Sequence, residues 1–229
     1  MLYPSALIRG VLMERTAFVL ADVRLDDGQI VAAYCPNMTK MTGVAAEGCD
    51  VWMSFDDGPY RRIRHTIELV DVNGTLVGVN TDSRAALVAE AINDGVFDSL
   101  SGYGAVTPSP SPSVCDLDLT DAVLPPCRIA VLPAYEKKAT GLLFPDDVDT
   151  ANRLVLRELE QCLDAGCRAV SVVLAQRGDC LAVRAAWTAD PVFVGALKNL
   201  CDKGLEIIAC GCSVSLDEIR VTVLLPFMF

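Results

Sequence analysis

The stretch "DTANRLVLRELEQCLDAGCRAVSVVLAQ", residues 149–176, gives the clearest indication of the fold class. Asp149 or Thr150 can cap a helix at its start, and Gly166 can end that helix. The residues that follow, 167–176, form a nearly continuous apolar run, which is typical of a strand buried on both faces of a sheet. The apolar face of the helix is predicted to consist of Leu154, Val155, Leu159, Cys162 and Leu163. A capped helix that leads directly into such a strand indicates a layered α/β domain.

The same alternation continues on both sides of this stretch. Downstream, residues 190–204 have the pattern of another helix, and residues 205–215 and 219–226 have the pattern of strands. Upstream, residues 114–135 contain two candidate strands, and residues 83–98 are predicted to form a helix. Strands interleaved with helices predict a mainly parallel or mixed sheet that is covered on at least one face.

The helix predicted over residues 83–98 has clear boundary signals. Asp82 or Ser83 can cap its start and Gly95 can end it. Its apolar face is predicted to consist of Leu87, Val88, Ala91 and Ile92. The next segment, "GAVTPSPSPS" at residues 104–113, alternates Pro and Ser, which favours an extended surface loop within the second domain.

The first third of the chain is β-rich. Short alternating stretches are separated by the turn sequences "DDG", "DDGP" and "NGT" about every ten residues, a spacing typical of a small barrel or sandwich. The candidate strands are "AFVLADVRL" (17–25), "QIVAAYC" (29–35), "CDVWMSF" (49–55), "IRHTIELVDV" (63–72) and "LVGVN" (76–80). We therefore expect a β-barrel domain over residues 1–82 and an α/β domain over residues 83–229.

Composition excludes several classes of protein. Hydrophobic residues make up 52% of the 229 residues, which is enough for a sizeable core, and no stretch has the length of a membrane span. The net charge of −11 argues against a broad nucleic-acid surface, although not against a local one. Most of the ten cysteines lie in apolar runs, so we expect reduced thiols and an intracellular protein of the cytoplasm or an organelle matrix. Cys210 and Cys212 lack the second pair that a zinc site needs, so no metal is expected there.

Several strings in the chain resemble the sugar fermentation stimulation protein A (SfsA) family. The matching strings include "FVLADVRLDDG" (18–28), "CPNMTKMTG" (35–43), "LVGVNTDS" (76–83), "LFPDDV" (143–148) and "LRELEQCLDAGCRAV" (156–170), in the order of the family. The resemblance implies an α/β (α+β) fold with an N-terminal OB-like β-barrel followed by a restriction-endonuclease-like domain of the PD-(D/E)XK kind. It also implies DNA binding and, by fold, metal-dependent DNA cleavage.

A nuclease of this kind needs an Asp and a Glu to hold Mg²⁺, and a Lys two residues after the Glu. The resemblance places the metal-binding Asp at Asp116 but places Ala130 at the Glu position and Leu132 at the Lys position. The family's cations before the long helix are replaced by residues 151–155, "ANRLV". Beside Asp116, only Asp146 and Gln176 remain in plausible places. We therefore expect no catalytic residues, no metal and no cofactor.

One alternative retains the chemistry at a shifted position. Glu136, Lys137 and Lys138 form another E-x-K sequence, but its use would require a six-residue shift in register. Pro133 would then fall within a central strand, where its missing N–H is poorly tolerated.

Two groups of cations are candidates for contacts with nucleic acid. Arg61, Arg62 and Arg64 follow the turn "DDGP" on a predicted strand and either contact phosphates or form a solvated face. Lys40, in the "CPNMTKMTG" loop, either contacts a phosphate or belongs to a loop that Asn37 shapes structurally.

The apolar C-terminus is a candidate for contacts with a protein. Phe227, Met228 and Phe229 either form a last strand against the core or anchor the chain to a partner. Three functions remain open from the sequence. The favoured one is a non-catalytic scaffold or subunit with protein partners. The others are a DNA-binding protein that uses the barrel face, and a Mg²⁺-dependent nuclease with a shifted site.

Overall fold

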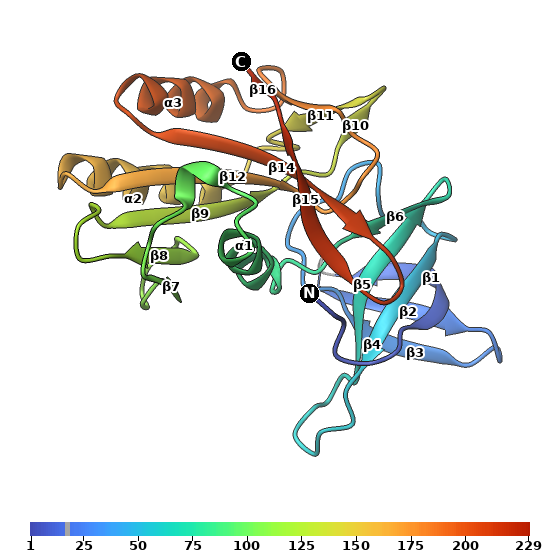
Figure 1. Cartoon of the computed structure of the whole chain (residues 1–229). Helices are drawn as coiled ribbons and strands as arrows, with labels where there is room; N and C mark the ends of the chain where they lie inside the picture. The colour runs from blue at the N-terminus through green and yellow to red at the C-terminus, as the bar shows by residue number, and fades with distance from the viewer. Residues whose placement is uncertain (17–18) are drawn as a thin grey trace.

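The computed structural model of the chain describes residues 1–16 and 19–229, so the first two residues of the strand predicted from residue 17 lie outside the described residues. It consists of a β-barrel domain and an α/β domain (Figure 1). The barrel strands are β1 (Ile8–Thr16), β2 (Leu20–Leu25), β3 (Ile30–Tyr34), β4 (Asp50–Phe55), β5 (His65–Val72) and β6 (Thr75–Gly78). The strand order is β3-β2-β1-β4-β5-β6, and an added parallel pairing of β3 with β5 closes the barrel.

Close packing inside the barrel explains one glycine of β1. A Cβ atom on Gly10 would lie 2.4 Å from Val23 Cγ1, so a larger residue would push β1 away from β2. The core of the barrel includes Leu12, Val23, Val51, Met53, Ile67 and Val77, all buried. The prediction of a small closed β domain is therefore confirmed.

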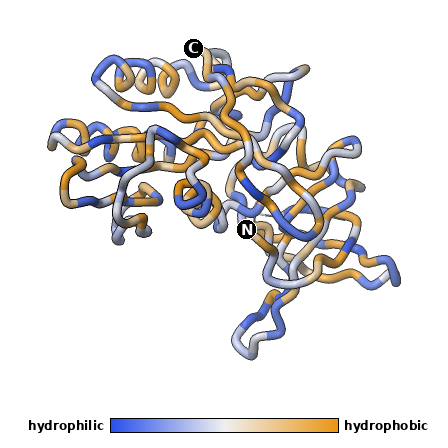
Figure 2. The backbone as a smooth tube through the Cα atoms, viewed as in Figure 1, coloured by the Kyte–Doolittle hydropathy of each residue, from blue (hydrophilic) through white to orange (hydrophobic). Residues whose placement is uncertain are grey.

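The second domain is built on a mixed six-stranded sheet, as predicted. Its order is β15-β14-β12-β9-β8-β7, with β9, β12 and β14 parallel and the remaining pairs antiparallel. The strands are β7 (Ala105–Pro108), β8 (Leu117–Thr120), β9 (Cys127–Pro133), β12 (Arg168–Ala175), β14 (Glu206–Val214) and β15 (Ile219–Leu225). Figure 2 shows that these central strands are predominantly hydrophobic, as expected for a sheet covered on both faces.

Helices cover both faces of this sheet (Figure 1). α1 (Arg84–Asn93) packs on one face, and α2 (Thr150–Asp164) and α3 (Pro191–Asp202) pack on the other. A short 3₁₀ turn, η1 (Asp98–Leu100), follows α1. A small second sheet, in the order β10-β11-β13-β16, lies beside α3 and consists of β10 (Lys137–Lys138), β11 (Gly141–Phe144), β13 (Ala182–Ala185) and β16 (Phe227–Met228).

The helices begin close to the predicted residues, but α1 ends at Asn93 and not at residue 98, and the predicted apolar face of α2 contains one error. Ser83 is the N-cap of α1, and all four residues predicted for its apolar face are buried. The Asp149 side chain caps α2 by accepting a hydrogen bond from the Ala151 N–H at 2.8 Å. Leu154, however, is 50% exposed, and Leu156 is buried in its place because the buried face of the helix begins at Val155.

The Pro/Ser-rich segment also differs from the prediction. Residues 105–108 form β7 and pair with β8, so only the part from residue 109 onward is a loop. β7 is the edge strand of the sheet, where Pro108 is tolerated because one side of the strand needs no ladder partner.

The two domains are joined by specific contacts. The Tyr135 side chain comes from the second domain but is buried in the core of the barrel. The Gly78 N–H of β6 donates to the Gln176 carbonyl at 2.7 Å, and a Cβ on Gly78 would lie 2.6 Å from the Gln176 Oε1 atom. The N-terminus of the chain also contacts the second domain, because the Met1 amino group lies 2.6 Å from Glu90 of α1. The barrel domain predicted over residues 1–82 therefore contains a few residues, such as Met1, that pack on the second domain.

None of the described helices is both long enough and apolar enough to cross a membrane. All ten cysteines are free thiols in the structure.

Candidate functional site

Asp116, the position matched to the metal-binding Asp, lies at the start of β8 and is occupied by contacts within the protein. Its carboxylate accepts a hydrogen bond from the Val131 N–H of β9 at 2.7 Å. Its other oxygen lies 2.8 Å from the Arg84 guanidinium at the start of α1. The side chain is only 9% exposed. Burial raises the pKa of Asp116 above its ordinary value, and Arg84 and the Val131 N–H oppose that effect.

Ala130 and Leu132 lie on β9 and point into the core between the sheet and helices α2 and α3. They are 0% and 4% exposed, respectively. Alternation along the strand explains this placement, because Ile129 and Val131 point to the opposite core beneath α1. The two positions matched to the Glu and the Lys therefore provide only apolar side chains, in a packed interior.

Asp146 is the second acidic remnant, and it binds the backbone after β9. Its carboxylate accepts hydrogen bonds from the Tyr135 N–H at 2.9 Å and from the Glu136 N–H at 3.3 Å. Burial raises the pKa of Asp146 to about 7 despite these two hydrogen bonds. The side chain thus organises the turn that directs Tyr135 into the barrel.

Gln176 and the start of α2 contribute no cation to this region. The Gln176 Nε2 atom donates to the Asn80 carbonyl at 3.3 Å, at the junction of the two domains. In residues 151–155, Arg153 contacts Asp190 at the start of α3 at 3.0 Å, which ties α2 to α3. Val155 is buried in the core.

The shifted E-x-K sequence lies outside the large sheet. β9 ends at Pro133, and Lys137 and Lys138 form β10 of the small sheet. Lys138 Nζ lies 3.3 Å from Glu136 Oε1, and Lys137 contacts Asp179 at 2.5 Å. Each charge of the sequence is therefore paired locally.

No group of three or more His, Cys, Asp or Glu side chains among residues 1–16 and 19–229 has the arrangement of a metal site. The carboxylates of Asp116 and Asp146 are each engaged with the backbone.

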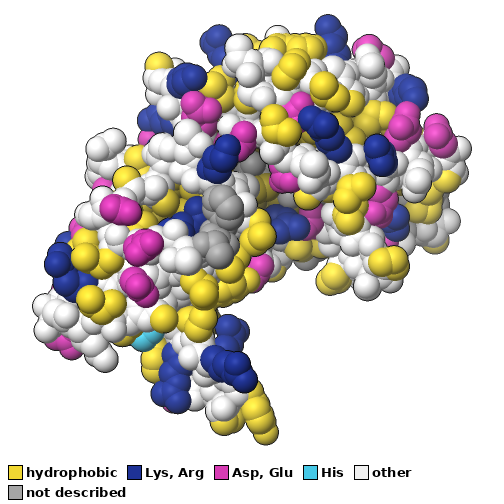
Figure 3. Space-filling model, turned by 180° about the vertical axis from the view of Figure 1, so that it is seen from behind, with side chains coloured by type: hydrophobic (Ala, Val, Ile, Leu, Met, Phe, Trp, Pro, Cys, Tyr) yellow, Lys and Arg dark blue, Asp and Glu magenta, His cyan; other side chains and the backbone are white. Residues whose placement is uncertain are grey.

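The basic residues predicted to lie on a strand lie instead in a loop. Residues 56–64 connect β4 to β5 and project from the barrel as an arm, with arginine side chains along it and the histidine at its base (Figure 3). The pairing of β4 with β5 ends at Phe55 and His65, so Arg61, Arg62 and Arg64 fall outside the ladder. All three are exposed, and the Arg61 Nε atom lies 3.0 Å from Asp56.

Lys40 lies in a different loop from this arm, and it forms an ion pair with Asp147 of the second domain. The loop that carries it is shaped by Asn37, which is fully buried. The Asn37 Nδ2 atom donates to the Val79 carbonyl at 3.2 Å, and its Oδ1 atom accepts from the Thr39 N–H at 3.0 Å. These contacts favour the structural interpretation of the loop.

The C-terminal residues divide between the two interpretations open from the sequence. Phe227 pairs with Val183 in the parallel ladder of β16 and β13 and packs against the core. Met228 and Phe229 are 38% and 46% exposed. The rings of Phe227 and Phe229 meet edge to face, with their centroids 5.2 Å apart. The tail is thus an edge strand whose last two side chains face solvent.

Sequence reasoning missed two residues that organise this region. Arg84 was assigned only to a helix, and Tyr135 only to a strand, although the first pairs with Asp116 and the second enters the barrel. Their partners lie far away along the chain, so no local spacing could have identified them.

Comparisons with known proteins agree with this architecture. The family model described as "SfsA N-terminal OB domain" matches residues 18–79, and the one described as "Sugar fermentation stimulation protein RE domain" matches residues 83–218. The sugar fermentation stimulation protein homolog of Maricaulis maris is 37% identical over 94% of this chain and 93% of its own length. The homolog of Brucella melitensis is 35% identical over 99% and 97%, respectively.

A solved structure has the same fold. The structure of Pyrococcus furiosus SfsA in complex with Ca²⁺ superposes with a TM-score of 0.89 at 17% identity, over 99% of this chain and 97% of the other. This likeness confirms an N-terminal OB barrel followed by an α/β domain. Together with the two family models, it shows that the chain belongs to the sugar fermentation stimulation protein A family.

Proposed function

We propose that this chain is a non-catalytic member of the SfsA family that acts as a scaffold or subunit of a larger assembly. The observation that carries the proposal is the burial of Ala130 and Leu132, at 0% and 4% exposure, where a nuclease of this fold would present Glu and Lys. A nuclease depends on carboxylates for its metal and on a cation near the scissile phosphate. Neither Ala nor Leu provides such a group.

A non-catalytic chain is also expected not to bind the metal ion of a nuclease. The Pyrococcus furiosus relative was solved with Ca²⁺, a hard cation that takes six to eight oxygen ligands. In this chain, the Asp116 carboxylate already binds Val131 and Arg84, and Arg84 brings a positive charge to the place where a cation would have to bind. We expect no saturable binding of Mg²⁺, Mn²⁺ or Ca²⁺ when the full chain is titrated calorimetrically. Stoichiometric binding that is lost in Asp116→Asn would contradict the proposal.

The proposed role as a subunit of an assembly rests on the domain contacts and the exposed tail that the chain retains. Tyr135 and Gln176 fix the two domains to each other, so the shape of the fold is kept while the chemical groups are absent. Met228 and Phe229 remain exposed at the edge of the small sheet. Aromatic and Met side chains of this kind are enriched at protein interfaces.

Size fractionation of native extract tests the assembly directly. We expect the chain to elute with protein partners, well above the position of a free 24.5 kDa monomer, and to stay there after nuclease treatment. Elution as a free monomer would contradict the scaffold function. A shift to the monomer position after nuclease treatment would favour the second candidate below.

A specific observation favours DNA binding as the second candidate. The arm carries Arg61, Arg62 and Arg64 on a projecting loop, together with Tyr60, which is 97% exposed (Figure 3). Guanidinium groups bind phosphates and exposed aromatic rings stack on bases, so the arm combines the two contacts that single-stranded nucleic acid needs. The overall charge of −11 argues against a broader nucleic-acid surface and so favours a local one such as this arm.

A further inference from the structure

The C-terminus of α2 brings two cysteines into contact. Cys162 lies in the last turn of the helix, and Cys167 follows Gly166, which has a φ of 77°. The Cys167 N–H donates to the Cys162 carbonyl at 3.0 Å, and the Gly166 N–H donates to the Leu163 carbonyl at 2.9 Å. These two bonds define a Schellman motif, in which the side chains at the positions of Cys162 and Cys167 meet.

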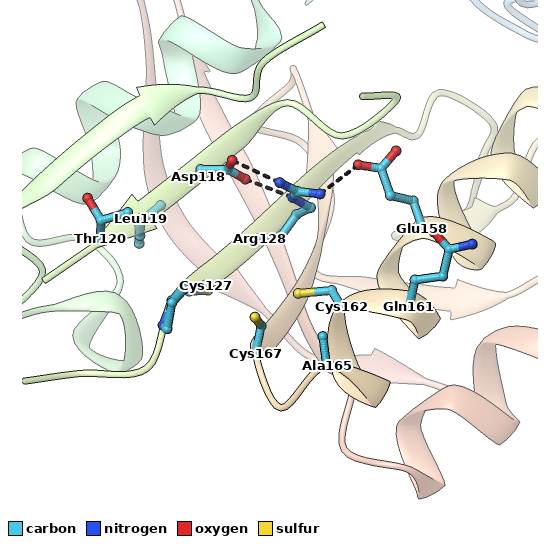
Figure 4. Close-up of a pocket in the computed structure, with 11 residues that line it drawn as sticks. Asp118, Leu119, Thr120, Cys127, Arg128, Glu158, Gln161, Cys162, Ala165 and Cys167 are labelled. Atoms are coloured by element: carbon cyan, nitrogen blue, oxygen red, sulfur yellow. Dashed lines mark hydrogen bonds and ion pairs between the residues drawn. The ribbon is translucent and has the colours of Figure 1, made fainter. Parts of the chain in front are cut away.

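The thiols meet beside a pocket. A cavity of about 250 Å³ is lined by both cysteines, together with Arg128 and Gln161. Figure 4 shows the two sulfur atoms on the same side of this pocket, close to the end of the helix. Burial raises the pKa of Cys162, and the neighbouring Cys167 thiol raises it further. Both are half-buried, so a small oxidant can reach them.

The surroundings of the pair distinguish it from Cys127, the third cysteine that lines the pocket. Arg128 lies near Cys162 and is held in place by Asp118 at 2.8 Å and by Glu158 at 3.0 Å (Figure 4). Its positive charge lowers the pKa of Cys162 and so offsets part of the larger effect of burial. Cys127 also lines the pocket, but it is 2% exposed and burial raises its pKa to about 12, so it is expected to be inert.

We propose that Cys162 and Cys167 form a site of reversible thiol oxidation, which a peroxide converts to an intramolecular disulfide. In the first step, the Cys167 thiolate attacks a peroxide oxygen, the O–O bond breaks, and Cys167 becomes a sulfenic acid while the peroxide is reduced to water or an alcohol. In the second step, the Cys162 sulfur attacks the Cys167 sulfur and water leaves. Two thiols thus give up two electrons and two protons, and a dithiol reductant returns them.

The positions of the two cysteines indicate that Cys167 reacts in the first step and Cys162 in the second. Cys167 lies beyond the end of the helix, whereas Cys162 lies within its last turn and the Cys162 sulfur is 3.4 Å from the Arg168 carbonyl. Burial raises the pKa of Cys162 to about 11, which keeps it protonated until the sulfenic acid forms beside it. Because the Schellman hydrogen bond already holds the two backbone segments together, the disulfide needs no unfolding of α2.

Peptide mass spectrometry tests this site without any variant. Trypsin cuts after Arg157 and Arg168, so residues 158–168, "ELEQCLDAGCR", are released as one peptide that contains both cysteines and no other. The reduced full chain is treated with hydrogen peroxide, its remaining thiols are alkylated, and the peptide is analysed. We expect most of it to have lost two hydrogens and to carry no alkyl group, and dithiothreitol should restore double alkylation.

Variants distinguish a reactive pair from general oxidation. Cys162→Ser should leave Cys167 as a sulfenic acid that dimedone traps, whereas Cys201→Ser, a change of a half-buried thiol in α3, should leave the disulfide yield unchanged. The proposal is overturned if the peptide stays doubly alkylated while other cysteines oxidise. It is also overturned if Cys167 pairs with Cys127 instead of Cys162.

Discussion

The carboxylate of Asp116 accepts a hydrogen bond from the backbone N–H of Val131 at 2.7 Å, just beyond the ladder that pairs β8 with β9. The side chain thereby satisfies a backbone group that the shorter strand β8 leaves unpaired. The second carboxylate oxygen binds Arg84 and so fixes α1 to the same point of the sheet. A residue matched to a catalytic position therefore has a structural role.

Asp116→Ala should lower the free energy of unfolding by about 1–3 kcal/mol, because it leaves the Val131 N–H and the Arg84 guanidinium without this partner. Urea unfolding followed by circular dichroism measures the loss. Asp57→Ala, which removes an exposed carboxylate of the arm, is the matched control and should change stability little. Equal effects of the two changes would contradict the structural role of Asp116.

Asp146 should make stability depend on pH. Its pKa is about 7 in the folded chain and about 3.8 in the unfolded chain, so the folded state binds the additional proton between these values. The stabilisation that this proton gives to the folded state is full below about pH 4 and is lost as the pH rises to about 7. The unfolding free energy should fall by about 2 kcal/mol between pH 5.5 and 8. Asp146→Asn cannot titrate, so its unfolding free energy should fall less over that interval. An identical pH dependence in the two proteins would show that this carboxyl does not titrate as described.

The arm can be tested by replacing Arg61, Arg62 and Arg64 together with Ser. If the chain binds DNA, the affinity of the unchanged protein for single-stranded DNA should fall steeply with salt, and the triple variant should lose binding. Its melting temperature should stay within about 2 °C, since all three side chains are exposed. Fluorescence anisotropy gives both the affinity and the salt slope. Binding that is insensitive to salt, or that survives in the triple variant, would exclude the arm.

The tail should divide into a structural and an interacting part. Phe227→Ala should lower stability by about 1–3 kcal/mol because the ring packs on the core, whereas Phe229→Ala should change it by less than about 1 kcal/mol. Deletion of residues 226–229 also removes the Pro226 carbonyl that accepts from the Val183 N–H at 2.9 Å, so it tests both parts together. We expect Phe229→Ala to weaken incorporation into the native complex without lowering the melting temperature appreciably. Full incorporation of this variant would exclude the exposed tail as the contact.

The sequence predicted the elements well where their signals are local. Asp149 caps α2 as expected, and the apolar run before Gln176 forms the central strand β12. Ser83 stands at the N-cap position of α1, but its side chain makes no capping hydrogen bond. The error at the arm has a local cause as well, because charged and apolar residues alternate over residues 62–65 although β4 is too short to pair with them. Strand pairing depends on the partner strand, which periodicity in one segment does not reveal.

The contacts of the candidate site could not be predicted from spacing. The resemblance to the family identified Asp116, Ala130 and Leu132 as the decisive positions. It did not indicate which groups bind the Asp116 carboxylate. Arg84 reaches Asp116 only because α1 packs on the sheet face opposite α2, an outcome of the tertiary fold. The structure also leaves Lys40 paired with Asp147, a contact across the domain junction that charge patterning alone does not reveal.

A cleavage assay on the purified full chain distinguishes a non-catalytic member of the SfsA family from a nuclease. Supercoiled, linear and single-stranded DNA are incubated with Mg²⁺ or Mn²⁺, and Asp116→Asn serves as the control for contaminating nuclease. We expect no cleavage above buffer, and identical traces for the two proteins, because Ala130 and Leu132 provide no ligand or cation. Robust cleavage that disappears in Asp116→Asn would contradict it, and cleavage that disappears only in Glu136→Gln would assign the activity to the shifted sequence.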